Sequence, residues 1–322
     1  MCDEAAFNAE VTARLAAIEG KLLDTAVGDS PFTTGAAQHV IAAGGKRMRP
    51  LLVILGSYFG SQVDEGRLVA AATVCEMTHV ASLYHDDVMD EAEVRRGVDS
   101  ANQKFGNHLA ILVGDFLFAQ ASSLIAELGE DYVQLQAATF SRLVQGQIAE
   151  TIGPEDGVGE SAHYLAVLSD KTASLISTAI VFGGMVSGAD EVTLSALGRY
   201  GEELGVLFQL ADDLMDITST QSGKQPGIDL RAGVKTLPLL LLAESADPAD
   251  DALKSLLAGD LSSDEALRAA LTQLRAHPVI EQARAELVRR AELAKSHIAE
   301  LGDGPAKTEL IALCDRQLAR VS

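Results

Sequence analysis

Tryptophan is absent from the 322-residue sequence, and aromatic residues make up only 4% of it. Runs of β-branched residues are scarce, whereas apolar residues reach 48% and alanine and leucine are abundant. This composition favours a large helical core over a sheet. No strand alternation is sustained, so the sequence predicts one all-α bundle, a single domain over residues 1–322 with about ten helices.

Cysteine is also scarce. Cys2, Cys75 and Cys314 lie far apart without a CxxC spacing, which argues against a disulfide framework or a cysteine zinc site and is typical of a reducing cytosol. The start, MCDEAAF, is acidic where a signal peptide would be basic. The longest apolar run, in TLPLLLLAES, is far too short to span a membrane. We therefore expect a soluble, cytoplasmic protein without a membrane span.

Positive charge is the third deficit. The chain has 25 Lys and Arg against 46 Asp and Glu, a net charge of −21. Nucleic-acid binding needs a basic surface, so nucleic acid is not expected as the main partner. The acidity is explained most simply by a solvated surface that keeps the protein soluble.

The helical pattern is interrupted where Gly, Pro, Ser and Asp gather, at 27–31, 42–50, 95–100, 152–160 and 219–233. Between these connections, two long amphipathic helices are predicted, from about Glu65 to Asp90 and from about Glu191 to Ile217. Each ends in a DDxxD motif, DDVMD at 86–90 and DDLMD at 212–216.

In a helix, the first and last aspartates of each motif share a face, so Asp86 lies beside Asp90 and Asp212 beside Asp216. Their repulsion, and the negative end of the helix dipole, disfavour this arrangement unless a cation binds there. Hard oxygen ligands in small number suit Mg²⁺ bridging to phosphate. A solvated acidic helix end would explain one such motif, but two with the same spacing indicate two helices that face a pocket. Neither motif has the spacing or loop glycine of an EF-hand.

The few cations gather near these motifs. They are Lys46, Arg47 and Arg49 in GGKRMRP, Arg95 and Arg96 after the first DDxxD, Lys171 beside Thr172, and Lys224 after the second DDxxD. Arg suits bidentate phosphate binding and Lys neutralises charge as a point cation. For Arg47 and Arg231 we interpret the charge as surface solvation. The others indicate a polyanionic ligand held partly through metal and partly directly.

His79 lies two helical turns before Asp86 on the same face. Two interpretations stay open at this point, a structural hydrogen-bonded histidine and a ligand-binding one.

The ordered set GGKRMRP, HDDVMD with RRG, GDFL at 114–117, KT at 171–172 and QLADDLMD at 209–216 resembles the polyprenyl synthetase family of trans-type isoprenyl diphosphate synthases. The likeness runs to GIDLRAGVKTLP and so covers most of the chain. It implies an all-α fold of the isoprenoid synthase type, a homodimer and Mg²⁺. It also implies repeated condensation of an allylic prenyl diphosphate with isopentenyl diphosphate to a linear polyprenyl diphosphate.

The resemblance assigns roles to single residues. For the metal it implies Asp86, Asp90 and Asp212, with Asp87, Asp213 and Asp216 as weaker candidates. For the allylic diphosphate it implies Arg95, Lys171 and Lys224, and beside the reacting carbon Thr172 and Gln209. For the isopentenyl diphosphate it implies Lys46, Arg49, His79 and Arg96. Peripheral membrane contact would accompany product release.

The chain departs from the family pattern in two motifs. GVKT places Val234 where family members often have Lys, and the role is not carried over to Lys235. GQIAE, at 146–150, exchanges the two polar residues of the frequent GExxQ. Both departures concern substrate contacts and leave the class of reaction unchanged.

Product length is predicted from two small residues, Ala81 and Ser82, that lie one turn before Asp86. In the family, bulky aromatics at these places are associated with short products, so small residues here predict a medium- to long-chain enzyme. An alternative stays open, that small side chains only allow close helix packing.

Two other functions remain in view. A class I terpene cyclase is also all-α and Mg²⁺-dependent, but such enzymes usually keep only one DDxxD and line the cavity with aromatics. A regulatory subunit that binds prenyl chains without catalysis usually has degraded acidic motifs, whereas both are intact here.

Overall fold

The computed structural model describes residues 4–218 and 226–321. Over these residues the chain forms sixteen α-helices and one two-stranded hairpin, so the all-α prediction is confirmed. There are more helices than predicted because several expected segments are interrupted. Gly106, with φ 81°, separates α5 from α6 within one expected helical stretch.

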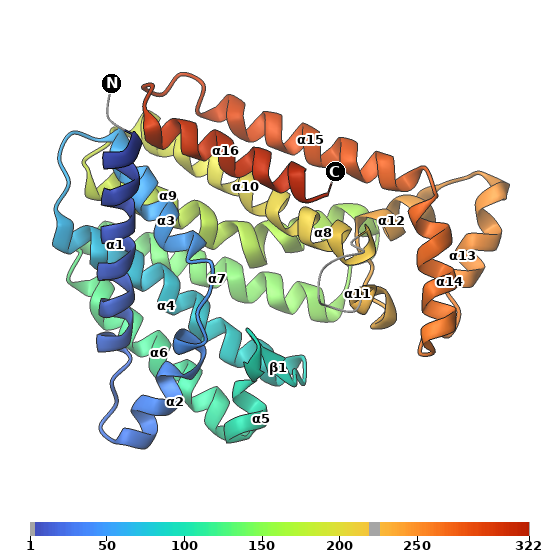
Figure 1. The fold of residues 1–322 in the computed structure, drawn as a ribbon, viewed down its shortest axis with the longest axis horizontal. Helices are drawn as coiled ribbons and strands as arrows, with labels where there is room; N and C mark the ends of the chain where they lie inside the picture. The colour runs from blue at the N-terminus through green and yellow to red at the C-terminus, as the bar shows by residue number, and fades with distance from the viewer. Residues whose placement is uncertain (1–3, 219–225, 322) are drawn as a thin grey trace. The chain divides into compact units, whose positions relative to one another are not determined.

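The elements follow one another along the ribbon of Figure 1. They are α1 (Glu4–Thr25), α2 (Pro31–Ala42), α3 (Met48–Gly56), η1 (Ser57–Phe59), α4 (Glu65–Met89), β1 (Val94–Arg95), β2 (Val98–Asp99), α5 (Ala101–Phe105), α6 (Asn107–Ala126), α7 (Glu130–Ile152), α8 (Glu160–Leu168), η2 (Ser169–Ala173), α9 (Ser174–Val186), α10 (Glu191–Thr218), α11 (Ile228–Arg231), α12 (Leu237–Glu244), η3 (Pro248–Asp250), α13 (Asp251–Leu257), α14 (Asp264–Arg275), α15 (Val279–His297) and α16 (Pro305–Arg320). The two helices predicted to carry the DDxxD motifs are α4 and α10, and their bounds agree with the prediction.

The chain divides into two compact units. Unit one takes the described residues of Met1–Ser141, Leu175–Gly198 and Glu300–Glu309, and unit two those of Arg142–Ser174, Arg199–Ala299 and Leu310–Ser322. The first DDxxD lies in unit one and the second in unit two. That residues 1–322 form one domain stays a prediction.

Helix α4 is the core of unit one. Asp64 caps its start by accepting a hydrogen bond from the amide of Arg67 at 3.0 Å. Alanines and other small residues fill its buried face, which packs along α6. The approach is close at Gly114, where a Cβ would lie 3.3 Å from the carbonyl oxygen of Ala81. This packing fixes the end of α4 that carries the first motif.

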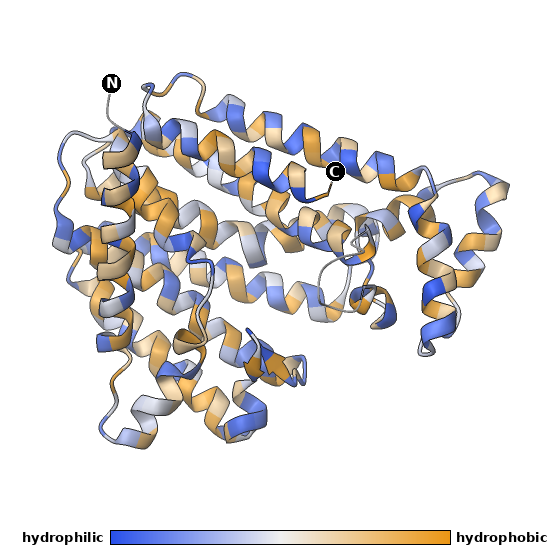
Figure 2. Cartoon of the chain, viewed as in Figure 1, coloured by the Kyte–Doolittle hydropathy of each residue, from blue (hydrophilic) through white to orange (hydrophobic). Residues whose placement is uncertain are grey.

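In unit two, the end of α10 that follows residue 199 carries the second motif. Its buried face includes Leu204, Leu207, Leu210 and Leu214, the apolar spacing expected of a core helix. The hydroxyl of Tyr200 donates to the carbonyl of Leu310 at 2.7 Å. Figure 2 shows charged and apolar residues alternating along α15, the pattern of a helix with one buried face.

Two helical stretches are long and apolar enough to cross a membrane by length and composition alone. They are α6 and the continuous segment from Glu160 to Val186. In the second, 61% of the residues in the apolar window are buried, as in a core helix of a globular protein. In α6 the share is 39%, because Leu109, Ile111 and Leu112 are exposed. The absence of a membrane span stays a prediction.

Candidate functional site

The first DDxxD lies at the C-terminal end of α4. Asp90 is the C-cap residue, and its amide donates to the carbonyl of Asp86 at 2.8 Å. The helical turn therefore continues through the motif, which places Asp86 and Asp90 one turn apart as predicted. Asp90 is exposed and Asp86 half-buried.

The middle carboxylate, Asp87, is fully buried. One of its oxygens accepts from Nε of Arg95 at 2.6 Å and the other from the amide of Ala101 at 3.1 Å. Asp87 thus connects α4 to the β1–β2 hairpin and to the start of α5. Its contacts are those of a structural residue, and they hold the Arg95 side chain beside the motif.

Arg47 begins α3 in the left-handed region, with φ 48°. Its guanidinium binds Glu19 at 2.6 and 2.7 Å and Glu76 at 3.1 Å, and its side chain is only 11% exposed. The interpretation of Arg47 as a surface charge is therefore wrong. A glutamate on α1 and another on α4 bury it, and neither partner is near it in the sequence.

Arg96 reaches the same glycine-rich turn from the hairpin. It donates to the carbonyl of Val40 at 3.1 Å and to that of Gly44, and it lies 3.8 Å from Glu76. A Cβ on Gly45 would lie 2.9 Å from Arg96 Cζ and 3.0 Å from a terminal nitrogen of Arg47. Because Gly45 has no side chain, the guanidinium groups of Arg47 and Arg96 can lie against its backbone.

Arg49 and His79 belong to the same cluster of basic side chains in unit one. Nε of Arg49 is buried and has no hydrogen-bond partner among the described residues. Burial lowers the pKa of Arg49, and the charge of Arg96 lowers it further. Burial also holds the pKa of His79 well below its ordinary value, as do the charges of Arg49, Arg96 and Arg95. His79, whose charged form is disfavoured, thus lies close to several guanidinium groups and to Glu76, and guanidinium groups are the side chains that bind phosphate oxygens best.

The second DDxxD has different partners. Asp212 forms an ion pair with Arg320 of α16. Asp213 is buried, accepts from the hydroxyl of Tyr164 and from Nε2 of Gln209 at 2.9 Å, and burial raises its pKa to about 6. Asp216 accepts from the amides of Ile228 and Asp229 at 3.2 and 3.1 Å, at the start of α11.

Lys171 and Thr172 do not lie in a regular α-helix, although the apolar sequence around them is typical of one. They belong to η2, a π-helical turn of five residues between α8 and α9. The ammonium group of Lys171 forms an ion pair with Glu150 of α7. Gln209, whose amide binds Asp213, lies in the same unit.

The structure sorts the predicted site residues by unit. Unit one holds Lys46, Arg49, His79, Ala81, Ser82, Asp86, Asp90, Arg95 and Arg96, whereas unit two holds Lys171, Thr172, Gln209 and Asp212. Lys224 lies outside the described residues. In the described part of the chain, no three side chains of His, Cys, Asp or Glu gather as a preformed metal site.

Sequence reasoning missed the residues that hold the site residues in place, namely Glu19, Glu76, Glu150, Tyr164 and Arg320. Glu150 alone had a signal, because it ends the altered GQIAE motif. The others are ordinary helical residues whose partners are distant in the sequence.

Comparison with known proteins places the chain among related sequences and structures. Residues 30–274 match the polyprenyl synthetase family. The chain is 44% identical over 320 residues to the nonaprenyl diphosphate synthase of Mycobacterium tuberculosis, covering 98% of this chain and 95% of that protein.

Two solved structures share its fold. The geranylgeranyl pyrophosphate synthase of Corynebacterium glutamicum, complexed with calcium and isoprenyl diphosphate, is 37% identical with a TM-score of 0.89, and the match covers 98% of both chains. The decaprenyl diphosphate synthase of Rhodobacter capsulatus is 30% identical with a TM-score of 0.87 and covers 99% of this chain and 100% of its own.

Proposed function

The chain belongs to the polyprenyl synthetase family and is a prenyltransferase, and from this premise we propose a specific reaction. It condenses an allylic prenyl diphosphate repeatedly with isopentenyl diphosphate and releases a linear polyprenyl diphosphate of medium to long chain. Relatives named as nonaprenyl and octaprenyl diphosphate synthases support the chain-elongating activity.

The observation that carries the proposal is the buried, unpartnered Nε of Arg49. A buried donor without an acceptor costs free energy unless a ligand supplies one. The charge of Arg96 is close enough to lower the pKa of Arg49, and both arginines lower the pKa of His79. A diphosphate oxygen would supply the missing acceptor. We assign Arg49, His79 and Arg96, with Lys46, to isopentenyl diphosphate.

The carboxylates of the two motifs fit a divalent cation by their chemistry. Aspartate oxygens are hard ligands, and Mg²⁺ is commonly bound through one or two carboxylates together with substrate phosphates rather than in an all-protein cage. We propose that Asp86, Asp90 and Asp212 hold Mg²⁺, with Asp216 as a weaker candidate. The bound ion would neutralise charge on the leaving diphosphate.

The side chains of the π-turn act on the other substrate. When the allylic C–O bond breaks, negative charge develops on the leaving diphosphate and positive charge on the allylic carbon. We assign Lys171, Arg95 and Lys224 to the stabilisation of the leaving diphosphate. We assign Thr172 and Gln209 to positions beside the reacting carbon. The double bond of isopentenyl diphosphate then attacks the allylic carbon, and the tertiary carbocation that results loses a proton from the adjacent carbon to form a new double bond.

Several partner and location assignments are part of the proposal. A second copy of the chain is the expected partner, and the exposed Leu109 and Leu112 of α6 offer an apolar surface for it. The protein acts in the cytoplasm and contacts a membrane peripherally when the long apolar product leaves.

Product length is assigned to Ala81 and Ser82. Ala81 is fully buried beside α6, which supports the close-packing interpretation for that residue. Ser82 is half-buried, and its hydroxyl donates to the carbonyl of His79 at 2.8 Å. Ser82 is therefore the better candidate for a residue beside the growing chain.

A single assay tests the reaction. The purified chain is incubated with isopentenyl diphosphate, an allylic primer and Mg²⁺, and the products are separated by length. Linear diphosphates longer than the primer are expected. Cyclic hydrocarbons would favour a terpene cyclase, and no turnover without a second protein would favour a regulatory subunit. Neither alternative is supported by the relatives described above.

A further inference from the structure

We propose that Arg142 of α7 is a positioning residue that holds the π-turn carrying Lys171 and Thr172. The inference rests on the proposed function, which assigns these two residues to the allylic substrate. Arg142 acts through its ion pairs with Asp170 and Glu202, and all of these residues belong to unit two.

The π-turn has an unusual geometry that needs support. The amide of Ser174 donates to the carbonyl of Ser169, five residues earlier, where an α-helix would bond four residues earlier. One extra residue in a turn rotates the side chains on either side of it by about 100° relative to an unbroken helix. The directions of Lys171 and Thr172 therefore depend on the turn keeping this form, and such turns occur frequently at functional sites.

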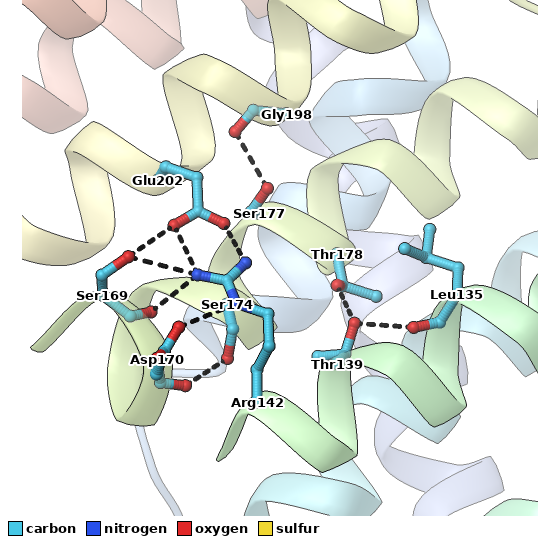
Figure 3. A network of polar contacts seen from close by, with 10 residues as sticks. All are labelled: Leu135, Thr139, Arg142, Ser169, Asp170, Ser174, Ser177, Thr178, Gly198 and Glu202. Atoms are coloured by element: carbon cyan, nitrogen blue, oxygen red, sulfur yellow. Dashed lines mark hydrogen bonds and ion pairs between the residues drawn. The ribbon is translucent and has the colours of Figure 1, made fainter. Parts of the chain in front are cut away.

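All three side-chain nitrogens of Arg142 donate hydrogen bonds, and two of them reach the first half of the turn (Figure 3). Nε donates to Asp170 at 2.9 Å, and one terminal nitrogen donates to the hydroxyl of Ser169 at 3.1 Å. The two terminal nitrogens bind the two oxygens of Glu202 on α10 at 2.6 and 3.2 Å. The planar guanidinium thus ties residues 169 and 170, directly before Lys171, to a glutamate on a long helix.

Two glycines hold the turn from its backbone side. A Cβ at Gly146 of α7 would lie 2.6 Å from the amide nitrogen of Lys171, and one at Gly205 of α10 would lie 2.4 Å from Cα of Ala173. These distances leave no room for a side chain, so α7 and α10 touch the turn through backbone. Gly146 and Arg142 are one helical turn apart on α7, and Gly205 lies three residues after Glu202 on α10. The faces of α7 and α10 that approach the turn therefore also carry Arg142 and Glu202, which form the ion pair.

Stability alone is a weak reason for this network. The side chains of Arg142 and Asp170 are each 40% exposed and that of Glu202 is 29% exposed. Ion pairs this open to water contribute little to the free energy of unfolding. The three donors lie in a fixed plane, so the guanidinium group instead fixes the positions of the side chains that it binds.

The next residue of α10 provides a matched control. Glu203 pairs with Arg290 of α15 at 2.9 Å, and their side chains are 17% and 16% exposed. This second Arg–Glu pair also belongs to unit two, but no contact of Arg290 in the described residues reaches the π-turn. Because it is the more buried pair, its loss should affect the free energy of unfolding at least as much.

The test compares Arg142→Met and Glu202→Gln with Arg290→Met. For each variant, kcat and the KM for both substrates are measured, together with the free energy of unfolding in urea. We expect kcat to fall by about tenfold to a hundredfold in Arg142→Met, as small displacements of catalytic groups do. Arg290→Met should keep kcat within about twofold, and Arg142→Met should keep the KM for isopentenyl diphosphate.

Arg142→Lys and Lys171→Ala are measured in addition. Arg142→Lys retains the charge without the planar fork, so its kcat should stay well below wild type. Glu202→Gln is isosteric and serves if Arg142→Met does not fold. Equal loss of kcat in Arg142→Met and Arg290→Met, with Lys171→Ala inactive, would overturn the inference about Arg142 but leave the role of Lys171 standing. Full activity of Lys171→Ala would overturn the assignment of Lys171 and the inference with it.

Discussion

Asp87 and Asp213 occupy the same position in the two DDxxD motifs, and both are buried, yet their surroundings are opposite. Asp87 faces a cation, Arg95, at 2.6 Å. Asp213 faces two neutral donors, Tyr164 and Gln209, and burial raises its pKa to about 6. One motif therefore binds its middle carboxylate by charge and the other by neutral hydrogen bonds.

The difference shows that a repeated motif does not give a repeated site. In both motifs the middle carboxylate is committed to the fold. The outer ones differ, because Asp90 is exposed at the end of α4, whereas Asp212 is paired with Arg320 and Asp216 caps α11. Binding a metal at the second motif would require Asp212 to exchange the Arg320 side chain for the ion. Among the described residues, Asp90 of the first motif has no cationic partner to exchange.

The largest expected effect tests what the motifs have in common. Asp86→Ala or Asp212→Ala should lower kcat by about a thousandfold or more, which corresponds to about 4 kcal/mol of transition-state stabilisation. The fold should persist, as measured by circular dichroism and urea unfolding. The exposed Asp131, at the start of α7, gives the control Asp131→Ala. Mg²⁺-dependent activity near wild type in either motif variant would reduce that motif to a charged helix end.

Substitution of the middle carboxylates, Asp87 and Asp213, tests the electrostatic difference between the two motifs. Asp87→Asn leaves Arg95 without its anionic partner, and since the Arg95 side chain is 27% exposed we expect a loss of about 2–3 kcal/mol in the free energy of unfolding. Asp213→Asn should change it by about 1 kcal/mol or less, because an amide can exchange hydrogen bonds with Tyr164 and Gln209. Urea unfolding of both variants measures this, and equal losses would remove the electrostatic distinction between the motifs.

The basic cluster of Lys46, Arg49, His79 and Arg96 is tested through binding. Lys46→Ala and Arg49→Ala should each raise the KM for isopentenyl diphosphate by about tenfold to a hundredfold, since one charge-assisted contact is worth about 1.5–3 kcal/mol. The KM for the allylic primer should change less. A rise confined to the primer would reverse the two diphosphate assignments.

Arg47→Ala is the matched contrast within the same turn. Arg47 is bound to Glu19 and Glu76, so its removal leaves buried Glu76 short of a cation and should lower the free energy of unfolding. Arg49 has an unpartnered Nε, so Arg49→Ala should lower stability less than Arg47→Ala.

The pH dependence of stability tests the cations that gather around His79. Burial, followed by Arg49 and Arg96, keeps its pKa well below the ordinary value of about 6.5. Below that pH the unfolded chain takes up a proton that the folded chain does not, so stability falls by up to about 1.4 kcal/mol per pH unit. His79→Gln should lose less stability than wild type between about pH 7 and pH 5. Parallel pH profiles would show that His79 titrates alike in both states.

The sequence predicted the features that are local in the chain. The all-α class and the bounds of α4 and α10 follow from apolar periodicity, and the motif aspartates lie one turn apart as their spacing requires. The role of Arg47 was predicted wrongly because its partner Glu19 lies on another helix. The π-turn at Lys171 was not predicted for a similar reason, because Gly146 and Gly205, which make room for it, are distant in the sequence.

The smallest effect on rate is expected from substitutions that alter product length. These lie at Ala81 and Ser82, beside the first motif. Ser82→Phe should shorten the product while kcat stays within about tenfold of wild type, because the new ring fills space near the motif but leaves its carboxylates in place. Ala81→Phe should instead destabilise the fold, since Ala81 is fully buried and Gly114 brings the backbone of α6 against its carbonyl. Chromatography of the products and urea unfolding separate the two effects. If Ser82→Phe keeps both the activity and the product length of wild type, the growing chain does not pass this turn of α4, and small residues there serve helix packing alone.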